Sequence, residues 1–247
     1  MKKYSYSDVI ESYPKDHMET LWTRFVTRPL SFPVAYFLVN IGCTAWLASV
    51  LSIIFALLSC FLLCMPSSVC RWIGIALLIL WLVFDCVDGN IARVTKKTSS
   101  MGEFIDAQSG YTVMAFVYFA VGMAAFNTPS LIFPDDKKYF LIIIGSLSSI
   151  FNITARLINS KYSYCYLKKC YINNLEYNTN EANERPTSLI GKIRFFADYH
   201  LGLVGIFMPL LIVCQFANTY DFVSIIYCAY SLVGFVFASV YFAYKSK

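Results

Sequence analysis

Long apolar segments constrain the fold of this chain more than any other feature. Residues 46–65 form a run of twenty without a charged side chain, and a helix of that length crosses the hydrocarbon core of a bilayer. Further apolar runs occupy residues 72–84, 111–126, 139–155, 201–217 and 222–244, with short polar or proline-containing breaks between them. The pattern predicts an all-α polytopic membrane protein with six transmembrane helices.

Composition argues against a soluble fold. Hydrophobic residues make up 58% of the chain and charged residues 14%, whereas soluble proteins have about 45–50% and about 25%. The nine cysteines are scattered, mostly within apolar runs, without a Cys-x-x-Cys pair. They indicate neither a zinc site nor a disulfide framework. The first thirty residues are polar, aromatic and charged, so no cleavable signal peptide is expected.

The distribution of basic residues predicts the orientation in the membrane. With six spans, 17 of the 20 lysines and arginines fall on the side that holds both termini. By the positive-inside rule, this places both termini in the cytoplasm. The expected location is the cytoplasmic (inner) membrane. The exceptions are Arg71, Lys137 and Lys138.

The chain divides into two parts. Residues 1–41 form a cytoplasmic segment, in which residues 32–41 are apolar but too short to span the membrane. We expect an interfacial amphipathic helix there, turning at Gly42 into the first span; the alternative is that these residues extend that span. Residues 42–247 form the six-helix membrane domain, with a basic cytoplasmic loop at about 159–197 between spans four and five. This loop is expected either to touch anionic lipid headgroups or to serve only as a positive-inside anchor.

Carboxylates stand beside very small residues near the end of the second span. Asp85, Asp88, Gly89 and Ala92 follow the spacing i, i+3, i+4 and i+7, so on a helix they share one stripe. The small residues lower the wall beside the carboxylates and let a bulky ligand approach the backbone.

A second stripe follows on the next helix. Gly102, Asp106 and Gly110 lie at i, i+4 and i+8, and Ser109 flanks them. Packing the two stripes together is expected to bring the three aspartates to one locus. Ionisable residues within spans are costly and usually mark function.

Three clustered carboxylates need a cation to offset their repulsion. Carboxylate oxygens suit hard ions, so Mg²⁺ or Mn²⁺ is expected, with two ions bound and Ca²⁺ as an alternative. Such ions polarise a phosphate and neutralise the charge that develops on it. If the aspartates were instead simple helix caps, the small residues beside them would remain unexplained.

The arrangement Asp85-x2-Asp88-Gly89-x2-Ala92-Arg93-x8-Gly102-x3-Asp106 resembles the motif of the CDP-alcohol phosphotransferase (CDP-alcohol phosphatidyltransferase) family. These are membrane enzymes of phospholipid and cell-envelope synthesis. The resemblance implies transfer of a phosphate-bearing group from a CDP-linked donor to an alcohol, with release of CMP. It also suggests a homodimer.

The resemblance assigns roles to individual residues. It implies that Asp85, Asp88 and Asp106 are catalytic metal ligands, and that Gly89 and Ala92 make room for the nucleotide. Arg93 would help to hold the cytoplasmic end of the site. The other candidate substrate-binding positions are Gly102, Ser109, Gly110 and Arg156, of which Arg156 either binds an acceptor phosphate or extends to the interface.

The chain departs from the family motif at Gly110, where the family has a fourth aspartate thought to be the general base. Three explanations remain open. The base comes from Glu103, Asp198 or His200; the acceptor is already an anion, such as a polyprenyl phosphate; or the protein binds nucleotide without turnover. An Asp-x-His at a helix start, as formed by Asp198 and His200, is more often an N-cap and its neighbour.

The sequence therefore predicts a metal-dependent membrane phosphotransferase with a nucleotide diphosphate donor and a membrane-associated acceptor. One alternative is a sugar-1-phosphate transferase that acts on polyprenyl phosphate, and another is a non-catalytic nucleotide- or lipid-binding membrane protein. A transporter is the weakest alternative, since no matched broken spans are found. Expected partners are membrane lipids and a second copy of the chain, with no nucleic acid.

Overall fold

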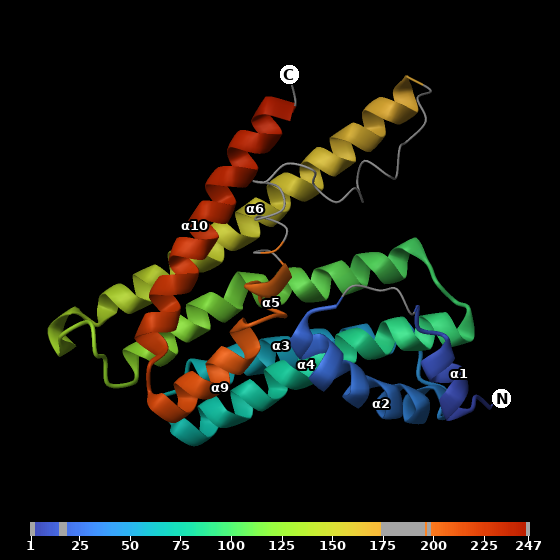
Figure 1. Cartoon of the computed structure of the whole chain (residues 1–247), viewed down its shortest axis with the longest axis horizontal. Coiled ribbons are helices and arrows are strands. Elements are labelled where there is room, and N and C mark those ends of the chain that lie inside the picture. Colours follow the sequence, from blue (N-terminus) through green and yellow to red (C-terminus); the bar gives the residue numbers. More distant parts are fainter. Residues whose placement is uncertain (1–2, 15–18, 174–195, 197–198, 246–247) are drawn as a thin grey trace.

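The structure, a computed structural model, describes residues 3–14, 19–173, 196 and 199–245. Within these residues every regular element is helical (Figure 1). In chain order they are α1 (Tyr6–Glu11), the π-helical turn η1 (Thr23–Thr27), α2 (Arg28–Asn40), α3 (Ala45–Leu63), α4 (Ser68–Thr95), α5 (Ser100–Phe126), the 3₁₀ turn η2 (Asp135–Lys137), α6 (Tyr139–Ile172), α9 (Phe207–Ala217) and α10 (Tyr220–Lys245).

Five of the described helices are long and apolar enough to cross a membrane: α3, α4, α5, α6 and α10. The fold class predicted from the sequence, an all-α polytopic membrane protein, is confirmed. The count of six long spans is not. The predicted fifth span, residues 201–217, contains α9, which has 11 residues. At 1.5 Å per residue α9 is about 17 Å long, well short of a hydrocarbon core of about 30 Å.

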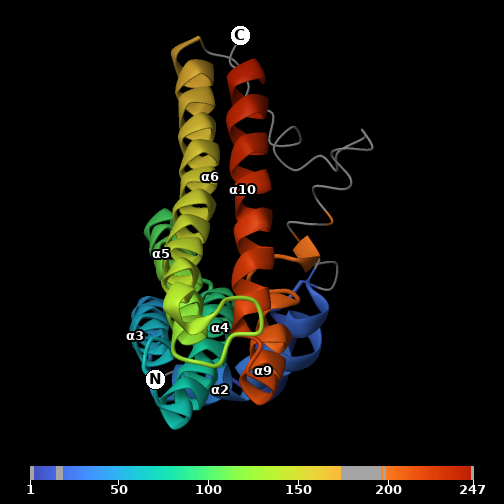
Figure 2. The same cartoon turned by 90° about the vertical axis from the view of Figure 1, so that its left-hand side faces the viewer.

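Contacts between the helices give their directions. Between α5 and α6, Phe119 N–H donates to the Ser149 hydroxyl at 3.0 Å, and the Tyr111 and Ser160 hydroxyls are 2.7 Å apart. A lower residue number on α5 thus pairs with a higher one on α6, so the two helices are antiparallel. Helices α6 and α10 are parallel instead, because the contacts advance together from Phe151–Phe235 to Tyr162–Phe242 (Figure 2). The chain between α6 and α10 must therefore return to the opposite end of the bundle.

The helix directions determine which helix ends lie together at each end of the bundle. The N-termini of α3 and α5 lie at the same end of the bundle as the C-termini of α4, α6 and α10. Most described basic residues of the bundle, including Lys97, Lys169 and Lys245, belong to that end, whereas Arg71, Lys137 and Lys138 belong to the other. The helix directions agree with the charge partition in the sequence. That this end faces the cytoplasm remains a prediction.

Small residues allow close helix crossings. A Cβ placed on Gly122 of α5 would lie 2.6 Å from the Leu141 carbonyl oxygen, and one on Gly145 of α6 would lie 2.7 Å from the Tyr118 carbonyl oxygen. Only glycine fits at such a crossing, and small residues are the usual means by which membrane helices approach one another. On α3, the Ser59 hydroxyl donates to the Gly74 carbonyl oxygen of α4 at 2.8 Å.

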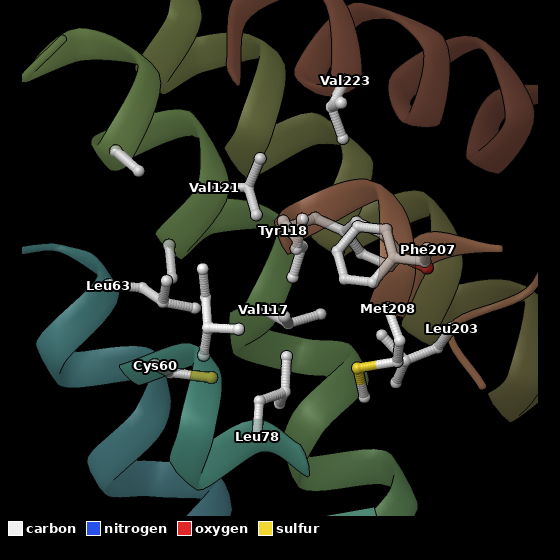
Figure 3. Close-up of a cluster of buried hydrophobic side chains, with 14 of the residues drawn as sticks. Cys60, Leu63, Leu78, Val117, Tyr118, Val121, Leu203, Phe207, Met208 and Val223 are labelled. Atoms are coloured by element: carbon white, nitrogen blue, oxygen red, sulfur yellow. The ribbon is translucent and has the colours of Figure 1, made fainter. Parts of the chain in front are cut away.

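The main apolar core joins α3, α4, α5, α6, α9 and α10 (Figure 3). Tyr118 of α5 lies at its centre, with its ring centroid 5.3 Å from that of Phe207 and 5.7 Å from that of Tyr227. Leu203 and Met208 are buried in the same cluster. Through these contacts α9 is attached to the bundle despite its shortness.

Residues before the first span form a separate helix. Helix α2 ends at Asn40, and Gly42 adopts a φ of 89° before Thr44 caps α3. The left-handed conformation is readily adopted by glycine, which explains the turn at this position. The predicted break at Gly42 is therefore confirmed, and residues 32–41 do not extend span one. Placement of α2 at the membrane interface stays a prediction.

Helix α6 continues into the segment that was predicted as a cytoplasmic loop. The loop between the fourth and fifth spans was expected to begin at about residue 159, but α6 continues to Ile172. No proline or glycine interrupts residues 159–172, and the rings of Tyr162 and Tyr166 stack one turn apart with centroids separated by 6.4 Å. The polarity of this stretch is that of a helix extending beyond the apolar layer. Most of the remaining predicted loop lies outside the described residues.

Candidate metal and nucleotide site

A four-residue turn between α4 and α5 brings the two acidic stripes together. Lys96 adopts a left-handed φ of 56°, and Lys97 N–H donates to the Ala92 carbonyl oxygen at 3.0 Å, which closes α4. The Ser99 hydroxyl then accepts from Gly102 N–H at 3.1 Å and starts α5. Residue Gly102 is therefore engaged in capping through its backbone.

A cavity of about 990 Å³ lies where this turn faces the connection between α2 and α3. From α4 it is lined by Asp88, Gly89, Ala92 and Arg93, and from α5 by Gly102, Glu103 and Asp106. Seven of the predicted site residues thus share one cavity wall. Its volume lies at the upper end of the range that encloses small-molecule ligands, about 300–1,000 Å³.

The third predicted aspartate, Asp85, lies behind this wall. Its carboxyl group hydrogen-bonds with that of Asp106, and both Asp85 and Asp106 interact electrostatically with Asp88. Asp85 of α4 is therefore in contact with Asp106 of α5, and each of them is within electrostatic range of Asp88. Asp88 is held separately: it accepts a hydrogen bond from the Ser49 hydroxyl of α3.

The donor chemistry of this cluster fits a hard divalent cation. Two carboxyl groups in contact require a proton or a cation between them, and all the donors are oxygen atoms. Among the described residues, however, no three acidic, histidine or cysteine side chains form a closed ligand set. The convergence of all three aspartates on a single ion therefore remains a prediction.

Arg93 is oriented by a buried polar network. Its Nη2 donates to the Asn90 side-chain oxygen at 2.8 Å, and Arg28 Nη1 approaches the same oxygen at 3.5 Å. Asn90 has no exposed surface and donates to the Ser31 hydroxyl at 3.0 Å, which ties α4 to α2. The Arg93 Nη atoms would lie 3.1 Å from a Cβ on Gly89. The guanidinium therefore covers the bare surface that was expected to receive the nucleotide.

The N-terminal segment completes this network. Arg28 forms an ion pair with Glu19, and the Tyr13 hydroxyl donates to the same carboxylate at 2.6 Å. The guanidinium carbons of Arg28 and Arg93 lie 4.3 Å and 5.4 Å from the centroid of the Tyr13 ring. Burial and the hydrogen bond to Glu19 raise the pKa of Tyr13 to about 12, so Tyr13 remains a hydrogen-bond donor at neutral pH.

Two helix N-termini open onto the cavity. Thr44 caps α3 by accepting from Leu47 N–H at 3.2 Å, and both Thr44 and Ser99, the cap of α5, line the cavity. The positive end of a helix dipole favours anions. Lys97 and Arg93 add full positive charges to the same wall. The cavity therefore combines acidic groups that attract cations with a basic rim that suits phosphate.

Other candidate residues lie elsewhere. Ser109 is buried and bonds the Trp81 indole N–H (2.8 Å) and the Ser52 hydroxyl (2.7 Å), so it joins helices rather than lining the cavity. Gly110 lies outside the lining residues, and a Cβ there would meet no atom within 4 Å. Arg156 is exposed on α6, away from the cavity lining.

The candidate general bases also differ in whether they line the cavity. Glu103 is exposed and lines the cavity beside Asp106. His200 is not among the lining residues: its carbonyl oxygen accepts from Ile206 N–H at 2.8 Å, and its ring centroid is 4.9 Å from that of Tyr199. Asp198 lies outside the described residues. Of the two candidates that the structure describes, Glu103 lines the cavity, where a substrate can reach it, and His200 does not.

Sequence reasoning missed Ser49 and Asn90. Ser49 is one of several small polar residues in an apolar helix, and Asn90 occupies a position that the motif leaves unspecified. Neither carries a spacing that distinguishes it before the helices are packed. Both become recognisable only through their partners.

An acidic cavity with a basic rim at one end of a helical membrane bundle defines a class of protein, the integral membrane enzymes that act on phosphate-bearing substrates. Comparison with protein families makes the assignment specific: the chain belongs to the CDP-alcohol phosphatidyltransferase family, whose model matches residues 43–233. It is therefore a membrane transferase of the phosphotransferase type. No curated protein sequence matches the chain significantly.

Proposed function

We propose that this protein transfers a phosphate-bearing group from a CDP-alcohol to a membrane-associated hydroxyl acceptor and releases CMP. The pathway would be phospholipid or cell-envelope glycan synthesis. The proposal is carried by one observation: Asp88 and Asp106, from different helices, line the same cavity of about 990 Å³. Membership of the family supports the nature of the donor.

A divalent ion, Mg²⁺ or Mn²⁺, would be held by Asp85, Asp88 and Asp106. The family resemblance implies that two such ions bind. When bound, it would neutralise negative charge on the donor's diphosphate. The chain's own residues supply the rest of the binding site. Arg93 and the N-terminus of α5 would orient the phosphate groups from the rim.

We further propose that Glu103 is the general base. A hydroxyl acceptor is a poor nucleophile at neutral pH and gains from a nearby group that takes its proton. Glu103 lies three residues before Asp106 on α5, within one helical turn. A hydroxyl approaching a phosphate held at Asp106 would come within reach of its carboxylate.

The remaining proposals concern assembly and orientation. The resemblance leads us to propose a homodimer in the cytoplasmic membrane, with the site and both termini on the cytoplasmic side. Charge asymmetry supports the orientation, since Lys97, Lys169 and Lys245 belong to the end of the bundle that carries the cavity.

The donor class can be tested with purified protein in liposomes. The protein would be incubated with Mg²⁺, mixed lipid acceptors and either a panel of CDP-alcohols or a panel of UDP-sugars, and the nucleoside monophosphates would be separated by chromatography. We expect CMP from at least one CDP-alcohol and no UMP. Release of UMP with polyprenyl phosphate as acceptor, without CMP from any CDP-alcohol, would contradict the proposal.

A further inference from the structure

Ser49 connects the first span to the acidic site. It belongs to α3, has 3% of its surface exposed and lines the cavity beside Asp88. Its hydroxyl lies in hydrogen-bonding contact with the Asp88 carboxylate, which is itself 6% exposed. Ser49 stands outside the motif stripes on α4 and α5.

The direction of this hydrogen bond follows from the available protons. A serine hydroxyl carries one hydrogen, and an ionised carboxylate can only accept. The alternative acceptor for Ser49 is the Ala45 carbonyl oxygen at 3.2 Å, within its own helix. When Asp88 is ionised, the hydroxyl must therefore point its hydrogen at Asp88. A buried carboxylate is costly unless it receives such bonds.

The bond also fixes orientation. Asp88 Oδ2 accepts from Ser49, and Oδ1 accepts from the backbone N–H of Gly89. One carboxylate is thus held between two helices, with lone pairs left on both oxygens. The carboxyl groups of Asp85 and Asp106 instead share a hydrogen bond with each other. Asp88 is consequently the aspartate whose position depends on the packing of α3 against α4.

We propose that Ser49 is a positioning residue that holds the Asp88 carboxylate in place to bind a divalent cation together with the nucleotide. The inference rests on the proposed function of the same site. Groups that orient metal ligands typically change metal affinity by about 10–100-fold when removed. We expect a loss of that size from deletion of the hydroxyl.

Two comparisons separate positioning from general stability. Ser49→Thr keeps the hydroxyl. Ser49→Val introduces a side chain of nearly the same volume as threonine but without the hydroxyl. Ser59→Ala is the matched control for Ser49→Ala, because Ser59 is also a buried serine of α3 that donates to α4. Its acceptor is the Gly74 carbonyl oxygen rather than a carboxylate. Thermal unfolding of each purified variant reports the structural cost.

The measurement is Mn²⁺ binding in the presence of CDP, followed by the electron paramagnetic resonance signal of free Mn²⁺. We expect Ser49→Ala and Ser49→Val to weaken Mn²⁺ binding about 10–100-fold, and Ser49→Thr and Ser59→Ala to bind within about threefold of the unmodified protein. Equal affinities for the threonine and valine variants, or an unchanged affinity for Ser49→Ala, would overturn the inference. Failure of the unmodified protein to bind Mn²⁺ with CDP would overturn the proposed function itself.

Discussion

Replacement of Glu103 by glutamine tests the proposed general base with little change in shape. Glutamine keeps the length of the side chain and its hydrogen-bonding capacity but cannot accept a proton at neutral pH. General-base catalysis typically contributes about 10²–10⁴-fold to the rate, which corresponds to about 2.7–5.4 kcal/mol of activation free energy. We expect kcat of Glu103→Gln to fall by that factor while the KM for the donor changes little.

The structure also offers a rescue. Gly110 lies one helical turn after Asp106, and Glu103 lies one turn before it. A Cβ at Gly110 would meet no atom within 4 Å. An aspartate there would stand about 5–6 Å from Asp106 between Cβ atoms. At an effective dielectric constant of about 20, their repulsion is about 3 kcal/mol, part of which a bound cation offsets. We therefore expect Gly110→Asp to restore the Glu103→Gln rate only partly, by at least about tenfold.

The assay is CMP release under single-turnover conditions, with Asp136→Asn as the control because Asp136 is an exposed acidic residue at the opposite end of the bundle. The control should match the unmodified protein. A Glu103→Gln variant with full kcat would refute the assignment of the base. A large fall in kcat that Gly110→Asp leaves unchanged would mean that the hydroxyl does not pass close to Asp106.

Three further predictions follow from the packing, the charge distribution and the cation requirement. Gly122→Ala should lower the unfolding temperature in detergent, because overpacking typically costs about 1–3 kcal/mol. Gly234→Ala should leave it unchanged, because a Cβ at Gly234 meets nothing within 4 Å. Equal effects of the two substitutions would contradict the close crossing of α5 and α6 at Gly122. A reporter fused at the C-terminus should be cytoplasmic, and a tag in the loop at residues 135–138 should be labelled from outside; the reverse pattern would show that the orientation is wrong. Chelation by EDTA should abolish CMP release and added Mg²⁺ should restore it; turnover unaffected by EDTA would exclude the divalent-ion requirement.

The sequence was sufficient for the parts of the fold that depend on local pattern. The stripe from Asp85 to Ala92 lies on α4, and the stripe from Gly102 to Gly110 lies on α5, because helical spacing alone decides which residues share a face. Gly42 was also identifiable locally, because a glycine after a short apolar segment is typical of a turn between helices. These features required no knowledge of the neighbouring helices.

Features that depend on packing were not predictable in this way. Ser109 stands next to Gly110 in the sequence, yet it turns toward Trp81, because consecutive residues along a helix point about 100° apart. The helical form of residues 159–172 was not predicted, because their polarity suggested a loop, whereas the absence of glycine and proline lets α6 continue to Ile172. Ser49 acquires its significance only from the approach of α3 to α4.

The central claim is that Asp85, Asp88 and Asp106 together hold a divalent cation against the diphosphate of a nucleotide. Anomalous scattering from Mn²⁺ in crystals of the complex with CDP tests it most directly. The account predicts an anomalous peak in contact with carboxylate oxygens of all three aspartates and with a phosphate of CDP, lost in Asp106→Asn. A nucleotide bound in the cavity with no anomalous peak beside these aspartates would contradict it.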